Sequence, residues 1–292
     1  MKLVTLASGD QYHLGVQTER GILDVTASAG AESGVPKDIH SLIEGGQSAK
    51  EALESFVRRQ EAGWLNEKEV QYGPAVTNPQ KIICVGLNYR KHAEETKAPI
   101  PEYPILFNKF NNTLTAHNCD VELPVASKEV DYEAELAIVI GRKAKHVSEE
   151  DALDYVFGYC CANDLSARDL QLRTNQWMLG KVCDGFTPLG PVLVTADEIP
   201  DPNALGIRTI VNGDVRQNSN TSDMIFNCKQ IISYISRHFT LNPGDVILTG
   251  TPEGVVLGYP KEKRVYLQPG DVVTVEIEKL GSITNRMVAE QI

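Results

Sequence analysis

The stretch "DYEAELAIVIGR", from Asp131 to Arg142, combines a core strand with a row of acids. Residues 136–140 are uniformly apolar, which predicts a buried β-strand. Asp131, Glu133 and Glu135 occupy alternate positions before them, so in an extended chain their carboxylates leave on the same face. Carboxylates at the start of a buried strand repel one another, and their pKa values rise unless solvent or a cation lies beside them.

Two interpretations of this row remain open from the stretch alone. A divalent cation between Glu133 and Glu135 would remove their repulsion. The alternative is the solvated face of an edge strand, which this stretch by itself slightly favours, because exposed acids on strands are common.

Composition and charge narrow the class of protein. The chain has 292 residues, 42% hydrophobic and 23% charged, which is typical of a globular protein. No apolar run is long enough to span a bilayer and the N-terminus is too polar for a signal peptide, so a cytoplasmic location is expected. A net charge of −11 disfavours nucleic acid and anionic membranes as partners. The six cysteines contain no C-x-x-C pair and are expected to be reduced.

The sequence predicts two domains. Strand candidates at residues 2–8, 12–17 and 21–26 precede a helix at 48–60, for which Ser48 and Glu51 match a capping box. A Pro- and Gly-containing stretch without periodicity, residues 72–81, marks the boundary. We therefore expect a small α+β domain over residues 1–74 and a catalytic domain over residues 75–292.

The second domain is rich in predicted strands. They lie at residues 81–86, 135–141, 156–163, 191–195, 207–213, 245–250 and 272–278, and helices are expected at 148–156 and about 223–238. Strands and helices do not alternate regularly, which disfavours a doubly wound parallel sheet. The fold class is therefore predicted as mainly β with α, that is, α+β.

A third acid follows another apolar strand. Asp164 comes directly after "FGYCCAN", at the end of a predicted core strand. Together with Glu133 and Glu135 it would complete an all-oxygen ligand set, which suits Mg²⁺, Mn²⁺ or Ca²⁺ better than zinc. The alternative role for Asp164 is an N-cap or an Asx turn.

A candidate base lies in "GLNYRKHAEE", residues 86–95. On a helical turn His92 and Glu95 lie side by side, so Glu95 could hold His92 in the tautomer of a general base. Glu94 could replace Glu95 if the turn is irregular. A charge pair on a surface helix is the alternative.

Two further stretches offer groups for an anion. Lys181 lies in an otherwise apolar setting, where it could neutralise an anionic intermediate or extend to the surface. Thr249 and Thr251 lie in a glycine-containing loop that offers hydroxyl and N–H groups, a signal that is weak by itself.

In this order, the motifs resemble those of the fumarylacetoacetate hydrolase superfamily, from Lys81 to near the C-terminus. The stretches that carry the resemblance are "ICVGLNYRKHAEE", "DYEAELAIVIGR", "NDLSARDLQ", "KVCDGFTPLGP", "VNGDVRQNSNTSDMIF" and "PGDVILTGTPEGV". The preceding domain looks like the variable N-terminal unit of many bacterial members. The resemblance implies a mixed β-sandwich or roll domain, usually in homodimers.

The resemblance also implies roles for nine residues. Glu133, Glu135 and Asp164 are implied as ligands of Mg²⁺ or Mn²⁺. His92 and Glu95 match the catalytic pair, carried on a lid segment that orders with substrate, and Lys181 matches the lysine at the metal site. The positions implied to contact substrate or support the metal are Arg168, Gln171 and Thr251.

The family acts on small 2-oxo acids, so the leading expectation is a hydrolase that cleaves a C–C bond in a β-diketo acid of the fumarylacetoacetate or acylpyruvate type. Two alternatives use the same metal site: decarboxylation of an oxaloacetate-type acid, and isomerisation of a 2-hydroxyhepta-2,4-diene-1,7-dioate type of substrate. A non-catalytic binding module is a further alternative, which the combination of base, orienting acid and lysine disfavours.

Overall fold

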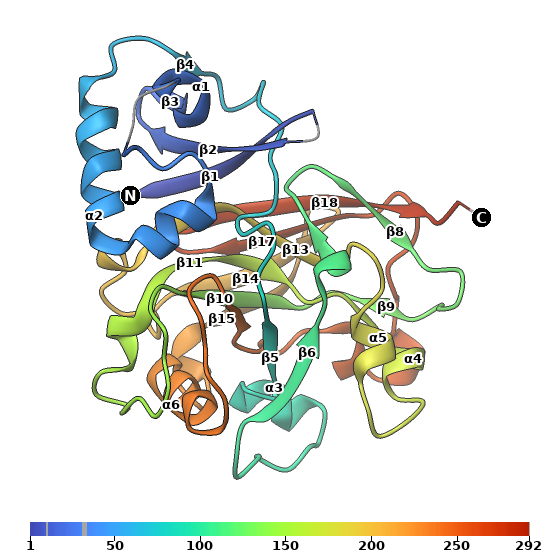
Figure 1. Ribbon diagram of the computed structural model, residues 1–292. Helices are drawn as coiled ribbons and strands as arrows, with labels where there is room; N and C mark the ends of the chain where they lie inside the picture. Colours follow the sequence, from blue (N-terminus) through green and yellow to red (C-terminus); the bar gives the residue numbers. More distant parts are fainter. Residues whose placement is uncertain (10, 31–33, 292) are drawn as a thin grey trace.

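Two β-sheets packed face to face form most of the molecule (Figure 1). The computed structural model describes residues 1–9, 11–30 and 34–291. The strands of the larger sheet are β1 (Lys2–Ser8), β2 (Gln11–Thr18), β3 (Gly21–Asp24), β4 (Trp64–Leu65), β5 (Ile82–Gly86), β6 (Ile105–Lys109), β7 (Leu114–Thr115), β10 (Ala134–Ile140), β11 (Val156–Asn163), β13 (Thr187–Thr195) and β16 (Val246–Leu248). Their order is β4-β3-β2-β1-β13-β11-β10-β16-β5-β6, and β7 pairs with β13.

The smaller sheet has the order β15-β14-β17-β18-β8. Its strands are β8 (Asp120–Leu123), β14 (Gly206–Val211), β15 (Asp214–Asn220), β17 (Val272–Ile277) and β18 (Gly281–Ala289). A separate two-stranded sheet pairs β9 (Val130–Asp131) with β12 (Ser166–Ala167). This mixed architecture confirms the predicted fold class.

Helices are few and mostly short. They are α1 (Val25–Ala29), α2 (Ile39–Arg59), α3 (Arg90–Glu95), α4 (Arg168–Gln171), α5 (Met178–Lys181) and α6 (Cys228–His238). The 3₁₀ turns are η1 (Asn111–Thr113), η2 (Ala152–Tyr155), η3 (Ala196–Glu198), η4 (Thr221–Asp223), η5 (Val256–Gly258) and η6 (Lys261–Lys263). In the described part of the chain, none of the helices has the length and apolar character needed to cross a bilayer.

Strand β10 explains why the sequence is apolar at every position over residues 136–140. Leu136 and Ile138 belong to a core cluster shared with β17 and β18 of the smaller sheet. Ala137 and Val139 belong to a second cluster, shared with α2 and β1 to β3. Because successive side chains of a strand point to opposite faces, a strand buried on both faces is apolar without alternation.

The N-terminal strands extend the larger sheet. Strand β1 pairs antiparallel with β13, with Lys2 opposite Val194 and Val4 opposite Val192. Figure 1 shows β1 to β4 and α2 together at one end of the molecule, away from α3 and α6. The N-terminal unit therefore shares backbone hydrogen bonds with the rest, and the domain boundary at residue 74 stays a prediction.

Helix α2 begins nine residues before the predicted start at Ser48. Asp38 caps it, accepting from the backbone N–H of Ser41 (2.8 Å), and Ser41 completes the capping box. Gly46, with φ of 57°, kinks the helix in the middle. Because the backbone at Gly46 is not helical, the predicted helix at 48–60 corresponds to the segment after the kink, whereas the capping box predicted at Ser48 and Glu51 was wrong: the box is formed by Asp38 and Ser41.

The predicted helix at 148–156 was wrong. Ser148 donates to the carboxylate of Asp151 (2.7 Å), which closes a turn, and only the 3₁₀ turn η2 follows. Helix α6 exists but begins at Cys228, where Asn227 and Gln230 form the capping box. In both predicted helices, side-chain hydrogen bonds to nearby groups compete with helix formation over the first residues of the predicted range.

Candidate active site

Three carboxylates from two neighbouring strands converge at the end of the larger sheet. Strands β10 and β11 pair with Ala134 opposite Asn163, so Asp164 arrives beside Glu133, whose carbonyl accepts its N–H (2.9 Å). Single carboxylate oxygens of Glu133, Glu135 and Asp164 all lie within 4.8 Å of one another. All three residues are buried, so the solvated-face interpretation of this row is wrong.

The row of acids is not one continuous strand. Strand β9 ends at Asp131, and the chain leaves regular pairing at Tyr132 and Glu133 before β10 begins. The side chain of Asn163 accepts the free N–H of Glu133 (3.0 Å), which holds the break in place. Despite the break, the carboxylate of Glu133 lies close to those of Glu135 and Asp164.

Two buried lysines neutralise Asp164 from different sides. Lys181, on α5, donates to Asp164 and to Glu133, each at 2.7 Å. Lys109, at the end of β6, donates to the other oxygen of Asp164 (2.5 Å) and to the carbonyl of Phe186 (2.8 Å). Lys109 was not predicted as a site residue. Its one distinguishing feature in the sequence is its place at the end of the strand-like run "ILFNK".

Asp131 binds Arg168 and the backbone of η5. Arg168 on α4 pairs with Asp131 (2.8 Å) and Glu133 (2.7 Å) and donates to Gln171 (2.9 Å). Asp131 also accepts the backbone N–H groups of η5, from Val256 (2.9 Å) and Leu257 (3.0 Å). The first acid of the row therefore anchors the wall of the site.

With every group ionised, the centre would hold four buried acids against three buried cations. The buried acids are Asp131, Glu133, Glu135 and Asp164, and the buried cations are Lys109, Arg168 and Lys181. Burial opposes ionisation of Glu133, yet Lys181 and Arg168 lower its pKa to about 2. Burial raises the pKa of Glu135 well above its ordinary value, and Asp164 and Glu133 add to the rise. Glu135 accepts one backbone N–H, from Gly250 (2.7 Å).

This donor set fits a hard divalent ion. Three carboxylates without a nitrogen or sulfur ligand suit Mg²⁺ or Mn²⁺, and such an ion would stabilise the charged form of Glu135 that burial and the other two acids disfavour. The ligands would be Glu133, Glu135 and Asp164.

A histidine base faces the same centre from α3. The Nδ1 atom of His92 lies 2.8 Å from Oε1 of Glu95, and Oε2 of Glu95 accepts the N–H of Gly254 (3.0 Å). An ionised carboxylate can only accept, so Nδ1 carries a proton, and in the neutral ring Nε2 then has the lone pair. Gly258 packs so closely that a Cβ there would lie 2.4 Å from the Glu95 carboxylate.

One cavity of about 190 Å³ joins these groups. Of the nine residues predicted for the site, all line it except Glu95 and Asp164, which lie directly behind lining residues. Apolar side chains also line it, among them Phe107, Trp177 and Leu257. Phe107 and Trp177 meet edge to face, with centroids 5.6 Å apart.

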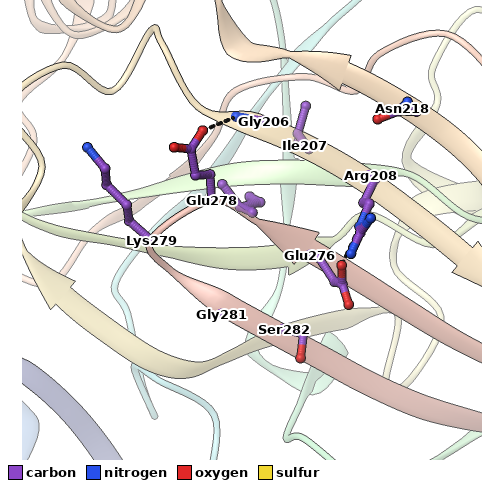
Figure 2. A pocket seen from close by; sticks show the side chains of 10 residues that line it. Gly206, Ile207, Arg208, Asn218, Glu276, Glu278, Lys279, Gly281 and Ser282 are labelled. Carbon is purple, nitrogen blue, oxygen red and sulfur yellow. Dashed lines mark hydrogen bonds and ion pairs between the residues drawn. The ribbon is translucent and has the colours of Figure 1, made fainter.

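A larger hollow of about 540 Å³ lies on the smaller sheet (Figure 2) and contains none of the predicted residues. Three of its charged groups have partners: Arg208 pairs with Glu276, and Glu278 accepts the N–H of Gly206. These side chains are not buried, so they lack the perturbed environment of the carboxylate centre. We therefore place the chemistry in the smaller cavity.

Comparisons with known proteins match most of the chain. A family model described as "Fumarylacetoacetate (FAA) hydrolase C-terminal" matches residues 81–288. A Xenopus laevis protein named as a mitochondrial oxaloacetate tautomerase is 45% identical over 294 residues, which cover 99% of this chain and 90% of that protein.

Solved structures extend the range of related activities. A maleylpyruvate hydrolase from Sphingobium, solved with manganese(II) and pyruvate, is 32% identical with a TM-score of 0.82. A 2-hydroxyhepta-2,4-diene-1,7-dioate isomerase from Mycobacterium marinum is 33% identical with a TM-score of 0.75. Each comparison covers 100% of both chains.

Proposed function

Because the chain belongs to the fumarylacetoacetate hydrolase family, we propose that it is a divalent-metal-dependent enzyme that interconverts the keto and enol forms of an oxaloacetate-type 2-oxo acid. The observation that carries the proposal is that one cavity joins a buried cluster of three carboxylates to a buried histidine whose Nδ1 is held by a glutamate. The name of the Xenopus laevis relative supports the choice of substrate.

The cofactor in this proposal is Mg²⁺ or Mn²⁺, held by Glu133, Glu135 and Asp164. Bound there, it would supply Lewis-acid polarisation of a 2-oxo group and its neighbouring carboxylate. The manganese and pyruvate in the Sphingobium structure support both the ion and the substrate class.

The chain's own groups then move the proton. His92 takes a proton from C3 of the keto acid at Nε2, while Glu95 keeps its Nδ1 proton in place. Burial opposes the charge of Lys181, yet Asp164 and Glu133 raise its pKa, so it remains an ammonium that stabilises negative charge on the substrate oxygen. Returning the proton from His92 to that oxygen gives the enol, and the reverse sequence gives the keto form.

Polar groups on the cavity wall would orient the substrate. Gln171 is held by Arg168, and Thr251 lies in the loop after β16. Both offer hydrogen bonds to a substrate carboxylate. Trp177 adds an apolar side chain to the cavity lining, and limited access of water there would favour proton transfer over hydrolysis.

Hydrolytic C–C cleavage of an acylpyruvate-type acid is the second candidate. The maleylpyruvate hydrolase with the same fold favours it. In that reaction His92 would take its proton from water, and Lys181 would stabilise the departing enolate. Decarboxylation and dioate isomerisation remain the further alternatives for the same site.

One panel of assays separates these reactions. The protein with Mn²⁺ is given enol-oxaloacetate, an acylpyruvate and an unsaturated 2-hydroxy dioate, with CO₂, acid and pyruvate release measured beside the loss of enol absorbance. We expect the enol absorbance to decay fastest, above controls with free Mn²⁺ alone, with chelator, and with the H92A variant. Faster acid release from the acylpyruvate would make the protein a hydrolase.

Assembly and location are part of the proposal. A homodimer is expected by analogy with the family, and light scattering of the purified protein tests it. A cytoplasmic location is still proposed, although the Xenopus laevis relative is named as mitochondrial. Cell fractionation distinguishes the two compartments.

A further inference from the structure

Gln217 reaches the site from the other sheet. It lies in β15, in the motif "DVRQNSN", and is 1% exposed while Arg216 and Asn218 on either side are exposed. Figure 2 shows Asn218 at the hollow on the outer side of the smaller sheet. Gln217 therefore points the opposite way, toward the interface with the larger sheet.

The orientation of the Gln217 amide is fixed by its partners. Its carbonyl accepts from the N–H of Ala134 (2.9 Å) and from the hydroxyl of Thr209 (2.6 Å). Its NH₂ group donates to the carbonyl of Pro252 (2.8 Å) and to the hydroxyl oxygen of Thr251 (2.9 Å). A backbone N–H can only donate and a backbone carbonyl can only accept, so the amide cannot be turned over.

This arrangement determines what Thr251 can do. A hydroxyl has one proton to donate, and the N–H of Gln217 already occupies an acceptor position on its oxygen. Thr251 lines the cavity, and among the described residues no acceptor receives its proton. The hydroxyl is thus left as a donor for a ligand.

We propose that Gln217 is a positioning residue, which holds the Thr251 hydroxyl as a hydrogen-bond donor to the carboxylate of a bound 2-oxo acid. The inference rests on the proposed function, because it requires such an acid in the cavity. Gln217 itself touches no ligand: its effect on binding passes through Thr251.

A double-mutant cycle tests this with Mn²⁺-loaded protein and pyruvate, read by calorimetry. Thr251→Val should weaken pyruvate binding about tenfold, as expected for a lost hydrogen bond to a carboxylate, while Thr251→Ser should keep most of it. Gln217→Met should weaken binding by a similar factor. In the Thr251→Val background it should cause little further loss.

Each outcome has a separate meaning. An equal loss from Gln217→Met in both backgrounds would assign Gln217 to general support of the fold and overturn the inference. Unchanged binding in Gln217→Met would do the same. If the wild-type protein binds neither Mn²⁺ nor pyruvate, the proposed function itself fails.

Two further variants complete the design. Asn218→Met, at the next position on the opposite face, should leave pyruvate binding unchanged. If Gln217→Met does not fold, Gln217→Glu carries the same cycle, because it keeps an acceptor for Ala134 and Thr209 but removes the NH₂ donor.

Discussion

Glu135 is the acid of the centre whose charged form is disfavoured when no metal ion is bound. Burial, then Asp164 and Glu133, raise its pKa well above the ordinary 4.5, so the metal-free fold favours its protonated form. A raised pKa contributes stability that is present below the unfolded value and is lost as pH rises through the folded value. Glu133, with a pKa of about 2, titrates far below neutral pH.

We therefore predict that chelated protein loses thermal stability as pH rises from the ordinary glutamate pKa of 4.5 toward the raised pKa of Glu135, whereas Mn²⁺ restores more stability at the upper end. Thermal unfolding across this range, with chelator and with Mn²⁺, measures both. Glu135→Gln should flatten the curve of the chelated protein. A stabilisation by Mn²⁺ that is independent of pH would contradict the assignment.

His92 should be separable from metal binding. His92→Ala should lower the tautomerisation rate by a factor of about 10² to 10⁴, as loss of a general base does, while Mn²⁺ affinity stays close to wild type. Glu95→Gln should cause a smaller loss, because it removes only the group that orients the ring. Stopped-flow absorbance and calorimetry give the two readouts, and parallel loss of both would mean that α3 supports the metal site.

Lys109 should matter most when no ion is bound. Lys109→Met leaves an oxygen of Asp164 without its cation in a fully buried setting, so the free energy of unfolding of chelated protein should fall by about 3 kcal/mol. Mn²⁺ should recover part of that loss, giving a larger thermal shift than in wild type. Equal shifts would show that Lys109 does not share the charge of the centre.

For single residues, the sequence was informative where the neighbouring residues in the sequence indicate the role. Glu133 and Glu135 stand out in an apolar strand, and His92 has its partner three residues away. Lys109 and Gln217 contact the site across separations of 55 and 34 residues, to Asp164 and Thr251. No local pattern predicts such pairs, because only the folded sheets bring them together.

Among the elements, the two-sided burial of β10 made it the easiest to predict, and helix starts were the least predictable. Asp38 and Ser41 cap α2, although they precede the amphipathic stripe from which the helix was inferred. A capping residue contributes through hydrogen bonds rather than burial, so hydrophobic periodicity does not detect it.

The cap can be tested directly. Asp38→Ala should lower the free energy of unfolding by about 1 kcal/mol, because the N–H of Ser41 loses its acceptor. Ser48→Ala is the matched control: its residue is exposed inside the helix and should change stability little. Chemical denaturation measures both, and a larger effect at Ser48 would restore the start predicted from the sequence.

Over the whole molecule, the pairing of β1 with β13 joins the N-terminal unit to the catalytic part. A fragment of residues 75–292 would expose the edge of β13 and the apolar face that α2 and β1 to β3 cover. We predict that it aggregates or melts well below the full chain, as followed by light scattering and calorimetry. A monomeric fragment of full thermal stability would support residues 1–74 as an independent domain.

The three acids lie in or directly beside the paired core strands β10 and β11, whereas His92 lies on a short helix, and this has an evolutionary consequence. The helix is held to its surroundings by contacts such as that from the N–H of Lys91 to Asp223 (3.1 Å). Proteins that diverge from a common ancestor can therefore change that helix and its loop while they keep the carboxylate cluster. One ancestral scaffold could thereby have given rise to catalysts that shift a proton, move a double bond or split a carbon chain.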